Sequence, residues 1–251
     1  MTEHVHSAAP TVGQLVAQRP ARARVFERFG IDYCCGGRKT LAAVCAQRGL
    51  ETSLVQSQLD AIDAEPHEGG APDWTTAPLS TLADHIQSVH HGFLNRELPR
   101  LDALVRKVAT VHGDVHPELR RLNNVFADFS QELEAHMAKE ESVLFPRILA
   151  LESGSPQDPS RSGPLEAPVR RMMQEHDDAG IALAAMRDLT HGYVPPEDAC
   201  GSYRVLLSGL QELEVDMHTH VHKENNILFP RALALDALRL GGVNACCTRP
   251  S

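Results

Sequence analysis

The chain has 251 residues, of which 42% are hydrophobic and 23% charged, and its formal net charge is −9. This composition excludes low-complexity and collagen-like chains, and the acidic balance without a lysine or arginine cluster argues against nucleic acid as a partner. No apolar run approaches the roughly 20 residues of a membrane helix and the first residues lack the pattern of a secretory signal, so we expect a cytoplasmic protein without a membrane partner.

The first part of the chain predicts a small helical domain. Short helical patterns separated by turns begin after Thr11 and Thr40, which are expected N-caps. We place this domain at residues 10–65. The Gly- and Pro-containing stretch at residues 66–78 is typical of a linker.

The next part predicts a bundle of four long helices over residues 79–240. Pro196 is expected in the first turn of the last helix, where its missing N–H costs nothing. No alternating strand pattern occurs, so the predicted fold class is all-α. Residues 241–251 are expected to form a flexible tail. The four helical patterns cover residues 79–110, 117–150, 166–190 and 196–238.

Part of this bundle is an internal repeat. The segment 136–151 matches the segment 220–235 at 10 of 16 positions with an offset of 84 residues, and His91 and His176 are 85 residues apart. The first helical hairpin is therefore predicted to recur as the second, as in an antiparallel four-helix bundle with pseudo-twofold symmetry.

Six polar side chains interrupt the apolar seams of the four helices. Within each predicted hairpin, the histidines of the two helices are about equally far in sequence from the turn, so all six side chains are expected in one layer of the core. Buried carboxylates without partners cost several kcal/mol, whereas two cations held by four imidazoles and two bridging carboxylates would satisfy all six groups. Nitrogen and hard oxygen donors without thiolate favour iron or manganese. We expect two iron ions, bridged by the carboxylates and an oxo or hydroxo group, with a position open on each. The six predicted ligands are His91, His136, Glu140, His176, His220 and Glu224.

Two further carboxylates precede predicted ligands on the same helices. Asp84 lies two turns before His91, and Glu132 lies one turn before His136. Either they orient imidazoles and shuttle protons, or they are solvated groups. The remaining bundle histidines are expected at the surface or in turns; they include His90, His112, His116, His191, His218 and His222.

A pair of adjacent cysteines, Cys34 and Cys35, precedes two glycines and the helix that starts after Thr40. Backbone N–H groups and the helix dipole could lower the pKa of these thiols. A redox pair, a transient metal or persulfide handle, and a packing turn all stay open. The other cysteines do not resemble a disulfide framework, and the pattern assigns no role to Cys45, Cys200, Cys246 and Cys247.

These motifs together resemble a known family. The Asp-Tyr-Cys-Cys-Gly-Gly segment at 32–37, ahead of His-x-x-x-Glu-Glu-x-x-Leu-Phe-Pro and His-x-x-x-Glu-Asn-Asn-x-Leu-Phe-Pro, is similar to the repair-of-iron-centres (RIC) proteins, which are bacterial di-iron proteins. The resemblance covers roughly residues 10–235. It implies a hemerythrin-like bundle, the same six ligands, and transfer thiols at Cys34 and Cys35. Hemerythrin itself has a less symmetric ligand set, which argues against a simple oxygen carrier.

The resemblance implies a stress-response protein that supports repair of iron–sulfur clusters damaged by nitric oxide or oxidants. It would donate iron, bind nitric oxide at the di-iron site, or do both. Damaged iron–sulfur proteins are the expected partners, nitric oxide or O₂ the expected small ligands, and a homodimer is also expected. Three alternatives stay open: a nitric oxide reductase, a reversible sensor or carrier of nitric oxide or O₂, and a purely structural bundle without iron.

Overall fold

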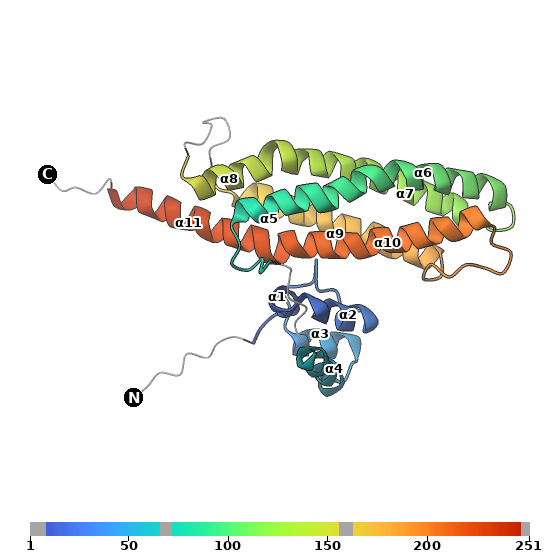
Figure 1. Ribbon diagram of the computed structural model, residues 1–251, viewed down its shortest axis with the longest axis horizontal. Coiled ribbons are helices and arrows are strands. Elements are labelled where there is room, and N and C mark those ends of the chain that lie inside the picture. Colours follow the sequence, from blue (N-terminus) through green and yellow to red (C-terminus); the bar gives the residue numbers. More distant parts are fainter. Residues whose placement is uncertain (1–8, 66–71, 156–162, 247–251) are drawn as a thin grey trace.

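The computed structural model describes residues 9–65, 72–155 and 163–246. Within these ranges every regular element is helical, apart from one isolated bridge between Thr11 and Thr40, so the all-α prediction is confirmed. Figure 1 shows four long helical rods side by side, with a small helical domain against one side of the bundle.

The four rods of the bundle are the helices that the sequence predicts, but three of them are divided by a short segment of different winding. The first rod contains α5 (Leu79–His85), η2 (Ile86–His91) and α6 (Gly92–His112). The second contains α7 (Glu118–Lys139), η3 (Glu140–Leu144) and α8 (Phe145–Ser153). The third is α9 (Glu166–Leu189). The fourth contains α10 (Gly201–Lys223), η5 (Glu224–Leu228) and α11 (Phe229–Cys246).

The segments η2, η3 and η5 are π-helical, which the periodicity analysis did not predict. In η3 and η5 the sequence offers a cause, because Pro146 and Pro230 lie two residues beyond these segments. A proline has no N–H to donate, and its ring collides with the carbonyl four residues earlier, so it disturbs the regular α-helical pattern, although α6 accommodates Pro99. Such π-turns are frequent at functional sites.

The loop before α10 also differs from the prediction. The sequence predicts a helix start near Pro196, whereas α10 begins at Gly201. His191, Gly192 and Tyr193 have positive φ angles of 51°, 74° and 65°, and the Tyr193 side chain is buried. Burial of this ring in the turn therefore takes precedence over the proline signal. At the other end, α11 continues to Cys246 and so extends into the expected tail, of which residues 247–251 lie outside the described part.

The small domain follows the predicted caps. Thr11 and Gln14 form a reciprocal capping box, and the Thr40 side chain accepts a hydrogen bond from the Ala43 N–H. Within the predicted linker, residues 66–71 lie outside the described part. The elements of this domain are α1 (Val12–Gln18), η1 (Pro20–Arg22), α2 (Ala23–Arg28), α3 (Leu41–Arg48) and α4 (Thr52–Ala64).

Two apolar cores fill the molecule. One joins the small domain to the half of the bundle around α6 and the loops beyond it, with Phe26 and Phe126 among its fully buried residues. The other lies around α5, α8 and α11, with Ile148 and Phe229 at its centre. The polar layer of the bundle lies between these two cores.

Candidate metal centre

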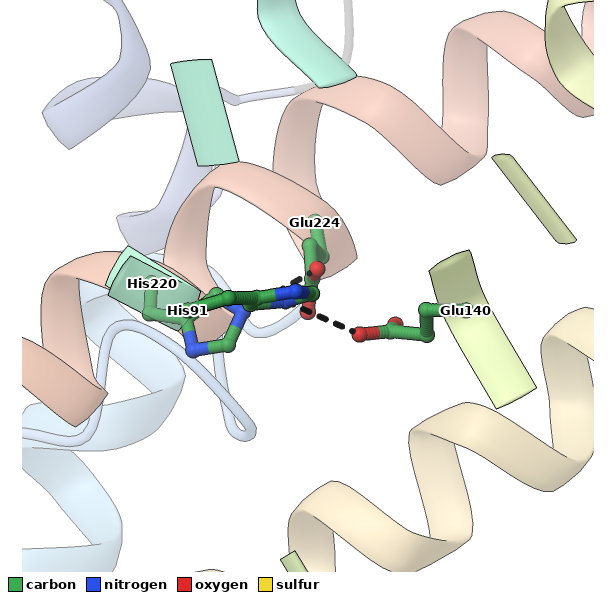
Figure 2. Close-up of side chains that lie close together, drawn as sticks. All are labelled: His91, Glu140, His220 and Glu224. Carbon is green, nitrogen blue, oxygen red and sulfur yellow. Dashed lines mark hydrogen bonds and ion pairs between the residues drawn. The ribbon is translucent and has the colours of Figure 1, made fainter. Parts of the chain in front are cut away.

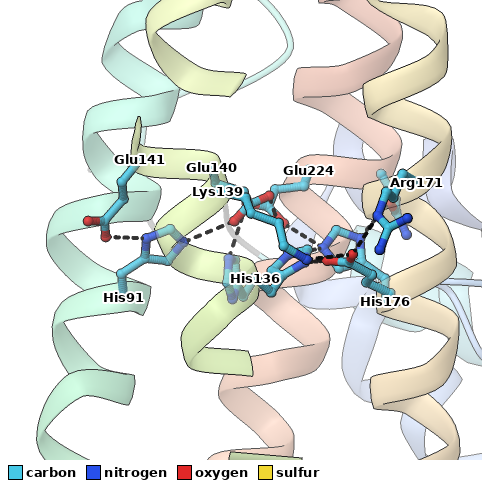
Figure 3. Close-up of polar contacts among 11 residues, drawn as sticks. His91, His136, Lys139, Glu140, Glu141, Arg171, His176 and Glu224 are labelled. Atoms are coloured by element: carbon cyan, nitrogen blue, oxygen red, sulfur yellow. Dashed lines mark hydrogen bonds and ion pairs between the residues drawn. The ribbon is translucent and has the colours of Figure 1, made fainter. Parts of the chain in front are cut away.

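Six side chains from all four rods of the bundle meet in one buried layer (Figure 3). None of the six is more than 3% exposed, so bulk solvent does not reach their polar atoms. The structure brings together every predicted ligand. They are His91 of η2, His136 of α7, Glu140 of η3, His176 of α9, His220 of α10 and Glu224 of η5.

Each of the two carboxylates lies between two imidazoles, with one oxygen turned toward each ring. In addition, the Nε2 atoms of His136 and His176 face each other at 3.0 Å. All four imidazoles thus direct Nε2 toward the carboxylates. The distances are 3.4 Å from Glu140 to Nε2 of both His91 and His136, and 3.1 and 3.2 Å from Glu224 to Nε2 of His176 and His220.

The donors form two sets of four that share both carboxylates. Within each set the candidate ligand atoms lie within 4.8 Å of one another. This arrangement could hold two neighbouring cations, with both carboxylates shared between them. The first set, drawn in Figure 2, is His91, Glu140, His220 and Glu224; the second is His136, Glu140, His176 and Glu224.

Several buried atoms of this layer have no hydrogen-bond partner among the described residues. They include His91 Nε2, both carboxylate oxygens of Glu140, and Glu224 Oε2. A buried charged group without a partner is strongly unfavourable. Cations would satisfy these atoms, and imidazole nitrogen with carboxylate oxygen is a donor set that suits divalent iron or manganese. The residues present therefore fit a two-metal centre.

The electrostatics of the layer keep both carboxylates ionised. Burial alone would raise the pKa of Glu224, but the neighbouring imidazoles of His220 and His176 hold it well below its ordinary value. The pKa of Glu140 is likewise lowered by His136, against the effect of burial and of the Glu224 charge. Burial would lower the pKa of His136, whereas the Glu140 carboxylate raises it to about 9.

Three of the ligand histidines are held from the outside through Nδ1. Such a hydrogen bond fixes the ring and leaves the Nε2 lone pair directed at the centre. Figure 3 shows the bond from His91 on the left of the layer. The Nδ1 hydrogens are donated by His91 to Glu141 (2.8 Å), by His136 to Glu175 (2.9 Å) and by His176 to Asn225 (2.9 Å).

These outer partners obey the same internal repeat as the ligands. Glu141 and Asn225 are 84 positions apart in the sequence, and the histidines that they hold, His91 and His176, are 85 apart. Each partner also directly follows a ligand glutamate. The duplication therefore includes the groups that orient the centre as well as the ligands themselves.

The second pair of outer groups breaks this symmetry. Glu175 and His90 are also 85 positions apart. Glu175 accepts the Nδ1 hydrogen of His136, whereas the ring of His90 stacks on His220, with the centroids 5.3 Å apart and the planes 1° from parallel. His220 Nδ1 has no hydrogen-bond partner among the described residues, so stacking holds this ring.

The prediction that His90 lies at the surface is wrong, because the ring is 3% exposed. Its Nδ1 donates to Asp216 at 2.8 Å, and the Lys223 ammonium donates to its Nε2 at 2.7 Å. Lys139 occupies the equivalent place in the first repeat, where it donates to Glu175 at 2.7 Å. Both lysines, which the sequence left unassigned, therefore fix the groups that hold ligand histidines.

Asp84 and Glu132 lie elsewhere. Both are exposed, and the glutamates described above accept the Nδ1 hydrogens of His91 and His136 in their place. Of the two alternatives for Asp84 and Glu132, the structure therefore favours solvated groups over groups that orient these rings. The reason is geometric: each ligand ring is held by a residue of the next rod, whereas a residue one or two turns earlier stays on the ligand's own rod.

The cysteine turn lies beside this centre. Its loop is fixed by Asp32, whose carboxylate accepts hydrogen bonds from the N–H groups of Cys34, Cys35 and Gly36 at 3.0, 2.9 and 2.8 Å. These backbone donors are therefore not available to a thiolate. The neighbouring Cys35 thiol, burial and the Asp32 charge raise the pKa of Cys34 well above its ordinary value, which corrects the prediction of a lowered thiol pKa.

The bundle contacts this turn through η5. Asn226 donates through Nδ2 to the carbonyl oxygens of Tyr33 (3.2 Å) and Cys34 (3.0 Å). On the other side of the turn, the Cys35 thiol is 3.5 Å from the backbone carbonyl oxygen of His176. The thiols are thus held next to the helix segment that carries a predicted metal ligand.

A second histidine that was expected in solvent is part of this contact. His222 is 5% exposed, and its ring packs edge-on against Tyr33 at a centroid distance of 5.5 Å. Burial lowers the pKa of His222 to about 4, so the ring is neutral at physiological pH. The helical angle from His220 correctly turns His222 away from the centre, but the small domain covers that face.

The fold and the site define a hemerythrin-like protein with a cation-binding four-helix bundle and a second, thiol-bearing helical domain. Two family models match the chain. The Hemerythrin HHE cation binding domain covers residues 82–232, and the ScdA_N domain, described as a domain of unknown function (DUF542), covers residues 8–63. Among the described residues, no helix is long and apolar enough to cross a membrane.

Known proteins match most of the chain. The iron–sulfur cluster repair protein YtfE of Pectobacterium carotovorum subsp. carotovorum is 36% identical over 223 residues, which is 89% of this chain and 96% of that protein. The protein of the same name from Escherichia coli O81 is 34% identical over the same shares. The chain belongs to this family of iron–sulfur cluster repair proteins, as its motifs predict.

Proposed function

We propose that this chain is a di-iron protein that supports the repair of damaged iron–sulfur clusters, with iron–sulfur proteins as its clients. The observation that carries the proposal is the pair of four-donor sets that share Glu140 and Glu224 in a dry layer. Similarity to proteins named for iron–sulfur cluster repair supports the assignment. The cargo of the repair reaction is ferrous iron held by the bundle.

In this proposal each chain residue has a defined part. His91 and His220 would hold one iron and His136 and His176 the other, and Glu140 and Glu224, which belong to both donor sets, would contribute to both. Two imidazoles and two shared carboxylates leave room at each iron for a small ligand, and bound iron would supply Lewis acidity and one-electron chemistry there. Nitric oxide and O₂ are the proposed ligands. The outer partners keep the imidazole lone pairs directed inward while iron enters or leaves.

The free thiols Cys34, Cys35, Cys45 and Cys200 support a reducing compartment, and we propose the cytoplasm. The expected homodimer stays a prediction, and sedimentation of the iron-loaded protein would test it.

The decisive experiment follows the activity of an iron–sulfur hydratase whose cluster has lost iron after exposure to nitric oxide or peroxide. The iron-loaded full chain should restore activity faster than the same amount of free ferrous iron, and a double variant, His136→Ala with Glu140→Ala, should not. Recovery no greater than that with free iron would contradict the proposal. Catalytic formation of N₂O without recovery of the hydratase would indicate a nitric oxide reductase instead.

A further inference from the structure

Three side chains of the cysteine turn are grouped as metal ligands would be. The sulfur atoms of Cys34 and Cys35 are 3.9 Å apart, and the Cys34 sulfur is 3.2 Å from Asp32 Oδ1. All three can supply donor atoms within 4.8 Å of one another. A tetrahedral site with metal–sulfur bonds of about 2.3 Å places its sulfurs about 3.8 Å apart. The thiols therefore already have the spacing of two ligands of one cation.

The cluster opens into a cavity that is also lined by His176, one of the six predicted ligands. This cavity has a volume of about 450 Å³, and its lining includes the three side chains together with His176, Gly180 and Met217. Gly180 faces Cys35 without a side chain, and a Cβ there would lie 3.7 Å from the sulfur. Space for an incoming ion or a further ligand thus exists directly beside the thiols.

We propose that Asp32, Cys34 and Cys35 form a second metal site, which binds a divalent transition cation through two thiolates and one carboxylate oxygen. A three-residue donor set leaves a position of a tetrahedral ion open toward the cavity. Thiolate ligands select ferrous iron, cobalt and zinc over magnesium or calcium. We further propose that its natural cargo is ferrous iron that passes between the bundle and a client protein, and this part rests on the proposed function.

Binding requires no oxidant or reductant. The two thiols release two protons to solvent as two metal–sulfur bonds form, and the cation keeps its oxidation state. Within the cluster, the cation replaces the thiol hydrogen that now lies between the Cys34 sulfur and Asp32 Oδ1. Its positive charge also offsets the mutual repulsion of two thiolates and a carboxylate, which otherwise keeps Cys34 protonated.

Contacts with the bundle hold the site in place. The loop is held by the two Asn226 hydrogen bonds, and Gly37 lies so close to Asn226 that a Cβ would be 2.3 Å from its Oδ1. The Cys35 sulfur in turn lies against the His176 backbone. An ion held at Cys35 is thereby kept beside the helix segment that presents a ligand of the second donor set.

Cobalt(II) is the appropriate probe, because thiolate ligation gives a sulfur-to-cobalt charge-transfer absorption in the near ultraviolet that imidazole and carboxylate ligands do not give. The test uses the full chain, loaded with iron, in a background where Cys200, Cys246 and Cys247 are replaced by serine. We expect a band that saturates at one cobalt per chain. Cys35→Ser and Cys34→Ser should abolish the band, and Asp32→Asn should weaken cobalt binding at least about tenfold.

Cys34 is buried, so Cys34→Ser is interpreted only if its circular dichroism and iron content match those of the background protein. If they do not, Cys35→Ser, at a half-buried position, is the deciding variant. No thiolate band in the background protein, or a band that survives Cys35→Ser, would overturn the site. A second measurement follows transfer of ferrous iron from the bundle to a chelator, which Cys35→Ser should slow several-fold. If the background protein shows the cobalt band but Cys35→Ser leaves the transfer rate unchanged, the transfer role alone is overturned. Neither readout uses a client enzyme, so failure of the repair function is distinguished from failure of this site.

Discussion

Asn225 and Asn226 are consecutive residues of η5, yet their side chains act in different domains. Asn225 Oδ1 accepts the Nδ1 hydrogen of His176 at 2.9 Å within the bundle, whereas Asn226 Nδ2 donates to the Cys34 carbonyl oxygen at 3.0 Å. The same π-helical turn presents Glu224 to the centre. One turn of helix therefore fixes a predicted bridging carboxylate, a predicted ligand imidazole and the thiol loop with respect to one another.

Gly37→Ala is expected to disturb this contact between the domains. A methyl group at residue 37 would lie 2.3 Å from Asn226 Oδ1 and 2.5 Å from the Tyr33 carbonyl oxygen, so the loop has to move. We expect a loss of about 1–3 kcal/mol in the free energy of unfolding. Amide hydrogen exchange in residues 33–37 should also become faster.

The matched control for this change is Gly201→Ala, because nothing lies within 4 Å of a Cβ at Gly201. Gly201 is the first residue of α10, so its replacement should leave exchange in the thiol loop at the wild-type rate. Equal exchange in both variants would show that the loop does not depend on close packing against Asn226.

The outer partners of the ligand histidines should tune metal affinity without contacting metal. Asn225→Ala removes the acceptor of His176, and Glu175→Gln removes the negative charge from the acceptor of His136; loss of such partners typically weakens metal binding about 10–100-fold. Competition with a chelator of known affinity measures this. Glu132→Gln, at an exposed position on α7, is the control and should leave the affinity unchanged. If it weakens binding as much as Glu175→Gln, the roles assigned from the geometry are wrong.

Because each bridging carboxylate belongs to both donor sets, removal of one should affect both metals together. Glu140→Gln is expected to lower iron from about two per chain to less than one, since it takes one ligand from each ion. The increase in thermal stability on iron loading should disappear with it. Elemental analysis and thermal unfolding provide the two measurements. The control is Glu134→Gln, on the exposed face of α7, which should keep the full iron content. If Glu140→Gln loses only one of the two ions, the two sites do not share this carboxylate.

The sequence was sufficient to predict the rods and the six inward-facing polar residues, because an apolar seam makes any His or Glu on it conspicuous. It did not predict the π-turns at Glu140 and Glu224, since a one-residue change in winding hardly alters a 3.6-residue period. The proline at 146 and its counterpart at 230 were available as signals. A proline disturbs the α-helical hydrogen-bond pattern, but Pro99, which lies inside α6, shows that a proline alone does not predict a π-turn.

The outer partners could not be predicted from the seams, because they lie on the flanks of the rods and act on the neighbouring rod. A usable signal was nevertheless present. Glu141, Glu175 and Asn225 each stand next to a predicted ligand, about 100° around the helix from it. The burial of His90 and His222 was missed for a different reason: the angle around one helix does not reveal which faces a neighbouring rod or the small domain will cover.

The small domain should lose part of its stability in acid through Asp63. Arg22 donates to both Asp63 oxygens, which ties η1 to α4, and this hydrogen bonding, together with the charges of Arg22 and Arg19, lowers the pKa of Asp63 below its ordinary value. A carboxyl with a lowered pKa in the folded state adds stability above its unfolded pKa of about 3.9, and this contribution is lost as the pH falls through the lowered pKa.

Asp63→Asn should therefore lower the free energy of unfolding by on the order of 1 kcal/mol at neutral pH, as loss of a partly exposed ion pair does. The difference from wild type should vanish in strong acid. Native-state hydrogen exchange of the α4 amides, corrected for the intrinsic rate at each pH, measures both. Asp60→Asn, at an exposed position of the same helix, should show no such pH-dependent difference, and a constant cost of Asp63→Asn at every pH would show that the ion pair is not its source.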